Sequence, residues 1–149
     1  MRKKRENYFN LEIPSDSTNE RFARQCVAAF VSTLDPTLSE LADLRTAVSE
    51  AVTNCIVHAY RGRLGKIYIS VEVSSSRRVV VRVRDCGCGM EDIELCRQPL
   101  YTSDPEGERG GMGFAIMESF CDRVKIKSQV GRGTTVTLIK TFTKENDPV

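Results

Sequence analysis

The segment KIYISVEVSSSRRVVVRVRDCGCG, residues 66–89, decides the fold. Apolar side chains occupy every second position of residues 67–73 and again of residues 79–83, which is the period of a strand with one face on a core. A serine-rich turn separates the two runs, so the pattern predicts a β-hairpin. Asp85 ends the second strand and is followed at once by a glycine-rich turn, which places a carboxylate at one end of the predicted sheet.

Two capping signatures upstream of the hairpin predict helices. Ser17 with Glu20, and Thr37 with Glu40, have the spacing of a capping box, in which a hydroxyl and a carboxylate satisfy free backbone N–H groups. The first helix is expected to end before Pro36, which disfavours helical geometry in its predecessor. The second is expected to reach about residue 60. The expected apolar faces are Phe22, Cys26, Ala29, Phe30 and Leu34 in the first helix, and Leu41, Leu44, Val48, Ala51, Cys55 and Ala59 in the second.

The remaining elements alternate helices with strands. The pattern predicts strands over residues 8–13, 123–129 and 134–142, a short helix over 91–96 and a buried helix over 114–121. Pro14 makes the first of these an edge strand. This order favours an α+β two-layer sandwich, with helices on one face of a mostly antiparallel mixed sheet. We expect a single domain over residues 1–149.

The composition excludes several classes of protein. The chain has 149 residues, of which 40% are hydrophobic and 28% charged, so it is neither disordered nor a coiled coil. Its formal net charge of +2 gives no ground to expect a nucleic-acid partner. No apolar run approaches the roughly 18 residues of a membrane span. Six cysteines without an export signal indicate reduced thiols, so we expect a cytoplasmic protein with no membrane partner and no direct nucleic-acid partner.

A row of polar residues follows the second predicted helix. Glu50, Asn54 and His58 recur every fourth residue and lie at the edge of the apolar face. Such a row can simply solvate the helix edge. Alternatively, Glu50 is a base and Asn54 a neutral oxygen ligand for a hard cation such as Mg²⁺, which takes few protein ligands.

Two glycine turns are placed at strand ends. Asp85-x-Gly87-x-Gly89 can be an ordinary turn, or it can let a flat ligand lie near the backbone while the carboxylate accepts the exocyclic amine of adenine. Gly133-Thr134 opens the last strand and is by default a hairpin turn, although its hydroxyl could add one contact to a base.

A third glycine-rich segment spans about residues 97–113 and ends in Arg109-Gly110-Gly111-Met112-Gly113, at the start of a predicted helix. Backbone N–H groups at a helix N-terminus beside an arginine make an anion site suited to phosphates. A flexible hinge is the alternative. The segment is not a P-loop, because no Gly-Lys-Ser/Thr follows the glycines.

These motifs, in this order, resemble the four nucleotide-binding boxes of the GHKL ATPase and kinase superfamily. A closer resemblance is to the sporulation anti-sigma F factors, which are serine kinases. It extends over about residues 8–142 and is carried by Asn19–Arg24, Ser49–Asn54, Arg97–Leu100 and Glu108–Glu118. The resemblance implies a Bergerat-type sandwich that uses ATP and Mg²⁺, with residues 97–113 as the ATP lid.

The resemblance also implies roles for individual residues. Glu50 is the expected catalytic base and Asn54 the expected Mg²⁺ ligand. The implied nucleotide contacts are Asp85, Gly87, Gly89 and Thr134 at the adenine end, and Arg109, Gly110, Gly111 and Gly113 around the phosphates.

The partners implied by the resemblance are a sporulation sigma factor, which is held inactive, and an anti-anti-sigma protein, which is phosphorylated on a serine. A homodimer is implied as well, and Arg24 on the exposed side of the first helix is a candidate partner contact. The alternatives are a general-stress anti-sigma B-type kinase and a nucleotide-gated anti-sigma module without kinase activity. The chain departs from the subgroup at Ser103-Asp104, where threonine and lysine are usual, and at Gly110, where serine is usual.

Overall fold

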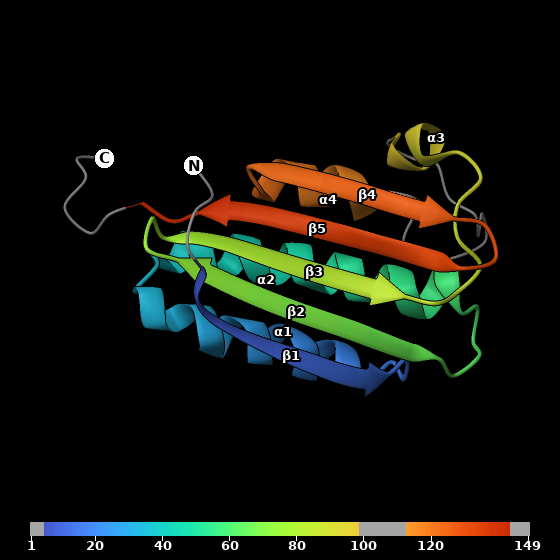
Figure 1. The fold of residues 1–149 in the computed structure, drawn as a ribbon, viewed down its shortest axis with the longest axis horizontal. Helices are drawn as coiled ribbons and strands as arrows, with labels where there is room; N and C mark the ends of the chain where they lie inside the picture. Colours follow the sequence, from blue (N-terminus) through green and yellow to red (C-terminus); the bar gives the residue numbers. More distant parts are fainter. Residues whose placement is uncertain (1–4, 99–112, 144–149) are drawn as a thin grey trace.

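A five-stranded antiparallel sheet forms one layer of the protein (Figure 1). The computed structural model describes residues 5–98 and 113–143. The strand order is β1-β2-β3-β5-β4, and every neighbouring pair is antiparallel. The strands are β1 (Arg5–Pro14), β2 (Lys66–Ser74), β3 (Arg78–Asp85), β4 (Arg123–Gln129) and β5 (Gly133–Thr141). The helices are α1 (Asn19–Val31), α2 (Leu38–Asn54), α3 (Ile93–Arg97) and α4 (Gly113–Phe120).

Helices α1, α2 and α4 cover one face of the sheet, and no described helix covers the other (Figure 1). The alternation predicted for the hairpin is confirmed, because Ile69 and Val71 of β2 and Val81 of β3 are at most 1% exposed beneath these helices. The α+β sandwich is therefore confirmed, with a sheet that is wholly antiparallel among the described strands. Strand β1 lies at the edge, as Pro14 predicted.

The predicted start of the first helix is wrong, and its predicted apolar face is right only in part, because Phe30 and Leu34 pack against the core but Phe22 does not. Thr18, not Ser17, precedes α1, and no side chain caps it; instead the Asp16 Oδ1 accepts a hydrogen bond from Thr18 N at 2.9 Å. Phe22 is 49% exposed. The buried face consists of small and β-branched residues, since these allow α1 to approach α2 closely: Ala23, Val27, Ala28 and Val31.

The second helix begins as predicted but changes form near its end. Thr37 Oγ1 accepts from Glu40 N at 3.1 Å, and Thr37 N donates to Glu40 Oε1 at 3.0 Å, which completes the capping box. After Asn54 the chain forms a π-helical turn, Cys55–Ala59, closed by a bond from Tyr60 N to Cys55 O. Such turns are rare and occur frequently at functional sites.

The two capping signatures provide a matched test. Thr37→Ala removes an acceptor from the start of α2 and is expected to lower the free energy of unfolding by about 1 kcal/mol. Ser17→Ala is expected to change it by less than about 0.5 kcal/mol, because the Ser17 hydroxyl caps nothing in the structure. Urea unfolding of both variants measures the difference, and equal losses would contradict the assignment of the caps.

Candidate functional site

The C-terminal half of α2 presents Glu50 and Asn54 to the first residue of α4. A Cβ added at Gly113 would lie 3.2 Å from Glu50 Oε2 and 3.2 Å from Asn54 Oδ1. Both oxygens therefore face the same point at the N-terminus of α4, and a side chain there would press on them. Glu50 is 8% exposed, which makes it one of few buried acidic residues in the described part of the chain.

Two cavities lie on either side of this point. A cavity of about 320 Å³ reaches from Asn54 and Gly113 to Asp85 and Thr134 and lies within the size range of ligand pockets. A more open groove of about 710 Å³ lies between α1 and α2 and includes Glu50 in its lining. Glu50 and Asn54, one helical turn apart, thus belong to different cavities.

Asp85 organises the far end of the smaller cavity. Its Oδ1 accepts from Gly87 N at 2.9 Å and from Thr134 N at 3.2 Å, although the residue is only 5% exposed. Burial raises the pKa of the Asp85 carboxyl, and the bonds from Gly87, the Cys55 side chain and Thr134 act in the opposite direction. The carboxylate is thus held by donors from the turn after β3, from the π-helical turn and from the start of β5.

The glycine turn after β3 is packed tightly between other segments. A Cβ at Gly87 would lie 2.4 Å from the backbone oxygen of Ala59, in the π-helical turn. Gly89 has a φ of +74°, and a Cβ there would lie 2.3 Å from the backbone oxygen of Gln129. Gly89 is thus required by its positive φ, whereas Gly87 is required by the close approach of the two backbones.

Two residues that the sequence analysis did not single out support this turn. Ser128 Oγ lies 2.7 Å from Thr134 Oγ1 and accepts a hydrogen bond from Met90 N at 2.8 Å. The Tyr60 hydroxyl accepts from Cys86 N at 2.7 Å and donates to the backbone oxygen of Lys66. These contacts join segments that are distant in the sequence, so no local motif marks either residue.

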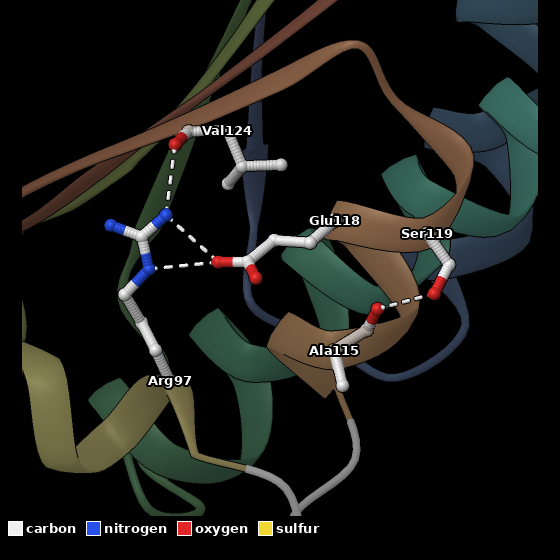
Figure 2. Close-up of polar contacts among 5 residues, drawn as sticks. All are labelled: Arg97, Ala115, Glu118, Ser119 and Val124. Atoms are coloured by element: carbon white, nitrogen blue, oxygen red, sulfur yellow. Dashed lines mark hydrogen bonds and ion pairs between the residues drawn. The ribbon is translucent and has the colours of Figure 1, made fainter.

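An arginine joins the two elements that flank residues 99–112. Figure 2 shows Arg97, at the end of α3, beside Glu118 of α4 and the backbone of Val124 in β4. Arg97 Nε and Nη2 each lie 2.8 Å from Glu118 Oε1, and Nη2 also donates to Val124 O at 3.1 Å. Two charge-assisted contacts from this guanidinium hold the end of α3 against α4, and a third holds it against β4.

The remaining predicted residues fall into two groups. Arg109, Gly110 and Gly111, with most of the predicted lid, lie outside the described residues. Arg24 was expected on the exposed side of the first helix, which is wrong: its side chain is 32% exposed, pairs with Glu20 at 3.7 Å and lines the groove between α1 and α2. The reason is that α1 turns Ala23 and Val27, not Phe22, toward the core, and this places Arg24 at the edge facing α2.

The described residues contain no cluster of three or more His, Cys, Asp or Glu side chains that could bind a metal ion without other ligands. The Asn54 amide oxygen suits a hard cation that takes most of its ligands from water and phosphate oxygens. None of the described helices is long and apolar enough to cross a membrane.

A family model and several known proteins match most of this chain. Residues 13–140 match the family model of the histidine kinase-like ATPase domain. The anti-sigma F factor of Pasteuria penetrans is 53% identical over 137 residues, covering 90% of both chains. That of Anoxybacillus flavithermus is 53% identical over 139 residues, covering 93% of this chain and 94% of its own. The chain belongs to the anti-sigma F factor family. Clostridium kluyveri has another member, 49% identical over 137 residues.

Solved structures outside the anti-sigma F factor family share its fold. The structure of the RsbU and RsbW domains of Rv1364c from Mycobacterium tuberculosis gives a TM-score of 0.67 at 19% identity, covering 92% of this chain and 32% of that one. The mycobacterial sensor histidine kinase MprB gives 0.56 at 13% identity, covering 89% of this chain and 97% of that one. At these identities the likeness concerns the fold alone.

Replacing Asp85 separates its structural role from its charge. Asp85→Ala leaves two buried N–H groups without their acceptor and is expected to lower the free energy of unfolding by at least about 2 kcal/mol. Asp85→Asn keeps an oxygen at Oδ1 and removes a buried charge, so we expect a change within about 1 kcal/mol.

Chemical denaturation at neutral pH measures both variants. Because burial raises the pKa of Asp85, the wild type loses stability relative to Asp85→Asn as pH rises through the ordinary carboxyl range. Equal destabilisation by both substitutions would show that the charge, rather than the acceptor geometry, holds the turn.

Proposed function

We propose that this chain is an ATP-dependent serine kinase that phosphorylates an anti-anti-sigma protein and also binds a sporulation sigma factor of the sigma F type. The observation that carries the proposal is the position of Glu50, between a groove open to α1 and the cavity that contains Asn54. In a kinase the nucleotide and the protein substrate must meet at the catalytic base. Helix α2 borders a separate cavity for each of them.

The smaller cavity suits the nucleotide. Asp85 at its far end would accept the exocyclic amine of adenine and would repel the carbonyl that guanine has at that position. Gly87, Gly89 and Thr134 would surround the base, and Gly113 with Arg109, Gly110 and Gly111 would contact the phosphates. Asn54 would hold Mg²⁺, which neutralises charge on the phosphates during phosphoryl transfer.

The groove between α1 and α2 suits the protein substrate. Arg24 Nε and Ser49 Oγ, both residues of its lining, are buried and have no hydrogen-bond partner. Leaving such atoms unsatisfied costs about 1–3 kcal/mol each, so a small side-chain movement that lets a docked segment bond to them would gain free energy. Arg24 is thus our candidate for partner contact, in the groove instead of on the open side of α1.

Glu50 would act as the general base. It takes the proton of the acceptor serine while the serine oxygen forms a bond to the γ-phosphorus, the bond from that phosphorus to the β–γ bridging oxygen breaks, and ADP leaves. Positioning and charge neutralisation supply most of the catalysis, since the transition state of such transfers is loose.

The sigma factor and a second copy of the chain are the other proposed partners. The names of the curated relatives support a sigma factor of the sigma F type over the general-stress alternative. Glu50 and Asn54 favour an active kinase over a module that only binds nucleotide and partner. We retain the homodimer as a proposal, and sedimentation of the purified chain with and without nucleotide tests it.

Substitution of Glu50, the proposed general base, tests the kinase activity directly. Glu50→Gln removes the proton acceptor but keeps the shape of the side chain, so kcat for transfer to the anti-anti-sigma protein is expected to fall about 100- to 10,000-fold. ATP affinity, measured by calorimetry, is expected to change little. Labelled ATP with the purified partner measures the transfer.

Glu20→Gln is the matched control, because Glu20 lines the same groove but lies away from Gly113. Its effect is expected on KM for the partner, with kcat nearly unchanged. Transfer by Glu50→Gln at the wild-type rate would refute the assignment of the base. Loss of ATP binding in that variant would instead make Glu50 a nucleotide ligand.

A further inference from the structure

The face of the sheet that carries no described helix is strongly basic over strands β3, β4 and β5, whereas β1 and β2 contribute Glu12 and Glu72 to it. On strands β3, β4 and β5 the side chains of this face alternate with those of the core, and none of them is Asp or Glu. The basic face, as we call it, consists of Arg78, Arg82, Arg84, Arg123, Lys125 and Lys127. The formal net charge of the whole chain is only +2, so the remainder is net acidic and the charges are segregated.

The register of the strands arranges these cations regularly. Arg84, Thr135 and Lys127 lie side by side on β3, β5 and β4 and form one row across the strands. Two residues further along each strand, Arg82, Thr137 and Lys125 form a second row. Neighbouring strands are about 4.8 Å apart and alternate residues about 6.8 Å apart. Four cations therefore mark the corners of an area of about 10 by 7 Å, with two hydroxyl groups between them.

Most of this charge is not neutralised by nearby carboxylates. Arg82 pairs with Glu72 at 3.4 Å, but within the described ranges Lys125 and Lys127 form no ion pair and are exposed. The guanidinium of Arg84 is held 4.1 Å above the ring of Tyr68 and remains exposed. An anionic surface could approach all of these groups at once.

We propose that the basic face binds the phosphate backbone of duplex DNA without sequence preference. Arginine, lysine and threonine side chains are the usual donors to phosphate oxygens. The net charge of the chain had given no reason to expect a nucleic acid, because it averages the two sides of the molecule.

The composition of the face favours nucleic acid over an acidic protein. Protein interfaces are enriched in aromatic side chains and depleted in lysine, whereas those with DNA are more polar and more positive. The apolar residues among the rows, Val80 and Ile139, are only 8% and 7% exposed and offer little area to a protein partner. A second copy of the face would bring like charges together.

Duplex is favoured over a single strand for a related reason. Binding of single strands relies on aromatic rings on which bases stack. Arg84 covers the ring of Tyr68, next to these rows, so that ring is closed to stacking. On this face strands β3, β4 and β5 carry no aromatic side chain, so their contacts with a nucleic acid would be to phosphates, as a duplex presents them.

Fluorescence anisotropy with a labelled duplex of arbitrary sequence tests the proposal. Affinity of the full chain is expected to fall about a hundred-fold or more between about 50 and 200 mM salt, since each of four or five phosphate contacts releases counterions. Lys125→Glu with Lys127→Glu is expected to weaken binding at low salt at least about tenfold. Thermal unfolding confirms that the variant is folded.

Arg21→Glu with Arg63→Glu is the matched control, because it changes the net charge equally at exposed positions on α1 and on the turn before β2. It is expected to leave most of the affinity intact. Equal losses in both double variants, or no binding by the wild type at low salt, would overturn the proposal. Poly-glutamate that binds as tightly as the duplex would indicate an acidic protein partner instead. A changed sedimentation coefficient of the Lys125/Lys127 variant would indicate an interface between copies of the chain. Either result would also overturn the proposal.

Discussion

The site depends on one buried carboxylate. Asp85 ends β3 and, through a single oxygen, accepts from the turn that follows and from the first residues of β5. Burial alone would favour the neutral acid, and it raises the pKa; the donors that converge on the group offset part of that cost. The same bonds hold Gly87 against the π-helical turn and Thr134 beside Ser128. One acceptor oxygen thus fixes the shape of the cavity at the end where the adenine ring is proposed to lie.

The other end of the cavity is fixed by packing. Glycine at position 113 lets the start of α4 approach Glu50 and Asn54, and the contacts of Arg97 with Glu118 hold the end of α3 to the same helix (Figure 2). Helix α2 lies between two cavities and is anchored by its capping box at one end and by its apolar face along its length. Its polar edge therefore borders both cavities while its other side belongs to the core.

Much of this architecture follows from local patterns, and the exceptions have physical reasons. Alternation in the hairpin predicted β2 and β3, and the Thr37 capping box predicted the start of α2. The prediction of which side of α1 faces the core failed at Phe22, because the size of an apolar side chain is a poor guide where helices pack closely. Small residues such as Ala23 and Ala28 allow the closest helix packing and form the buried side. No local pattern predicts the roles of Ser128 and Tyr60, because only the register of β4 with β5 and the π-helical turn bring them to the site.

The central claim is that Asp85 makes the cavity selective for adenine. Isothermal titration of the wild-type chain with ATP and with GTP, each with magnesium, tests it most directly. A carboxylate that accepts from an exocyclic amine should bind ATP and discriminate against the guanine carbonyl by at least about a hundred-fold, or about 2.7 kcal/mol. Equal affinity for the two nucleotides, or no binding of either, would contradict the account.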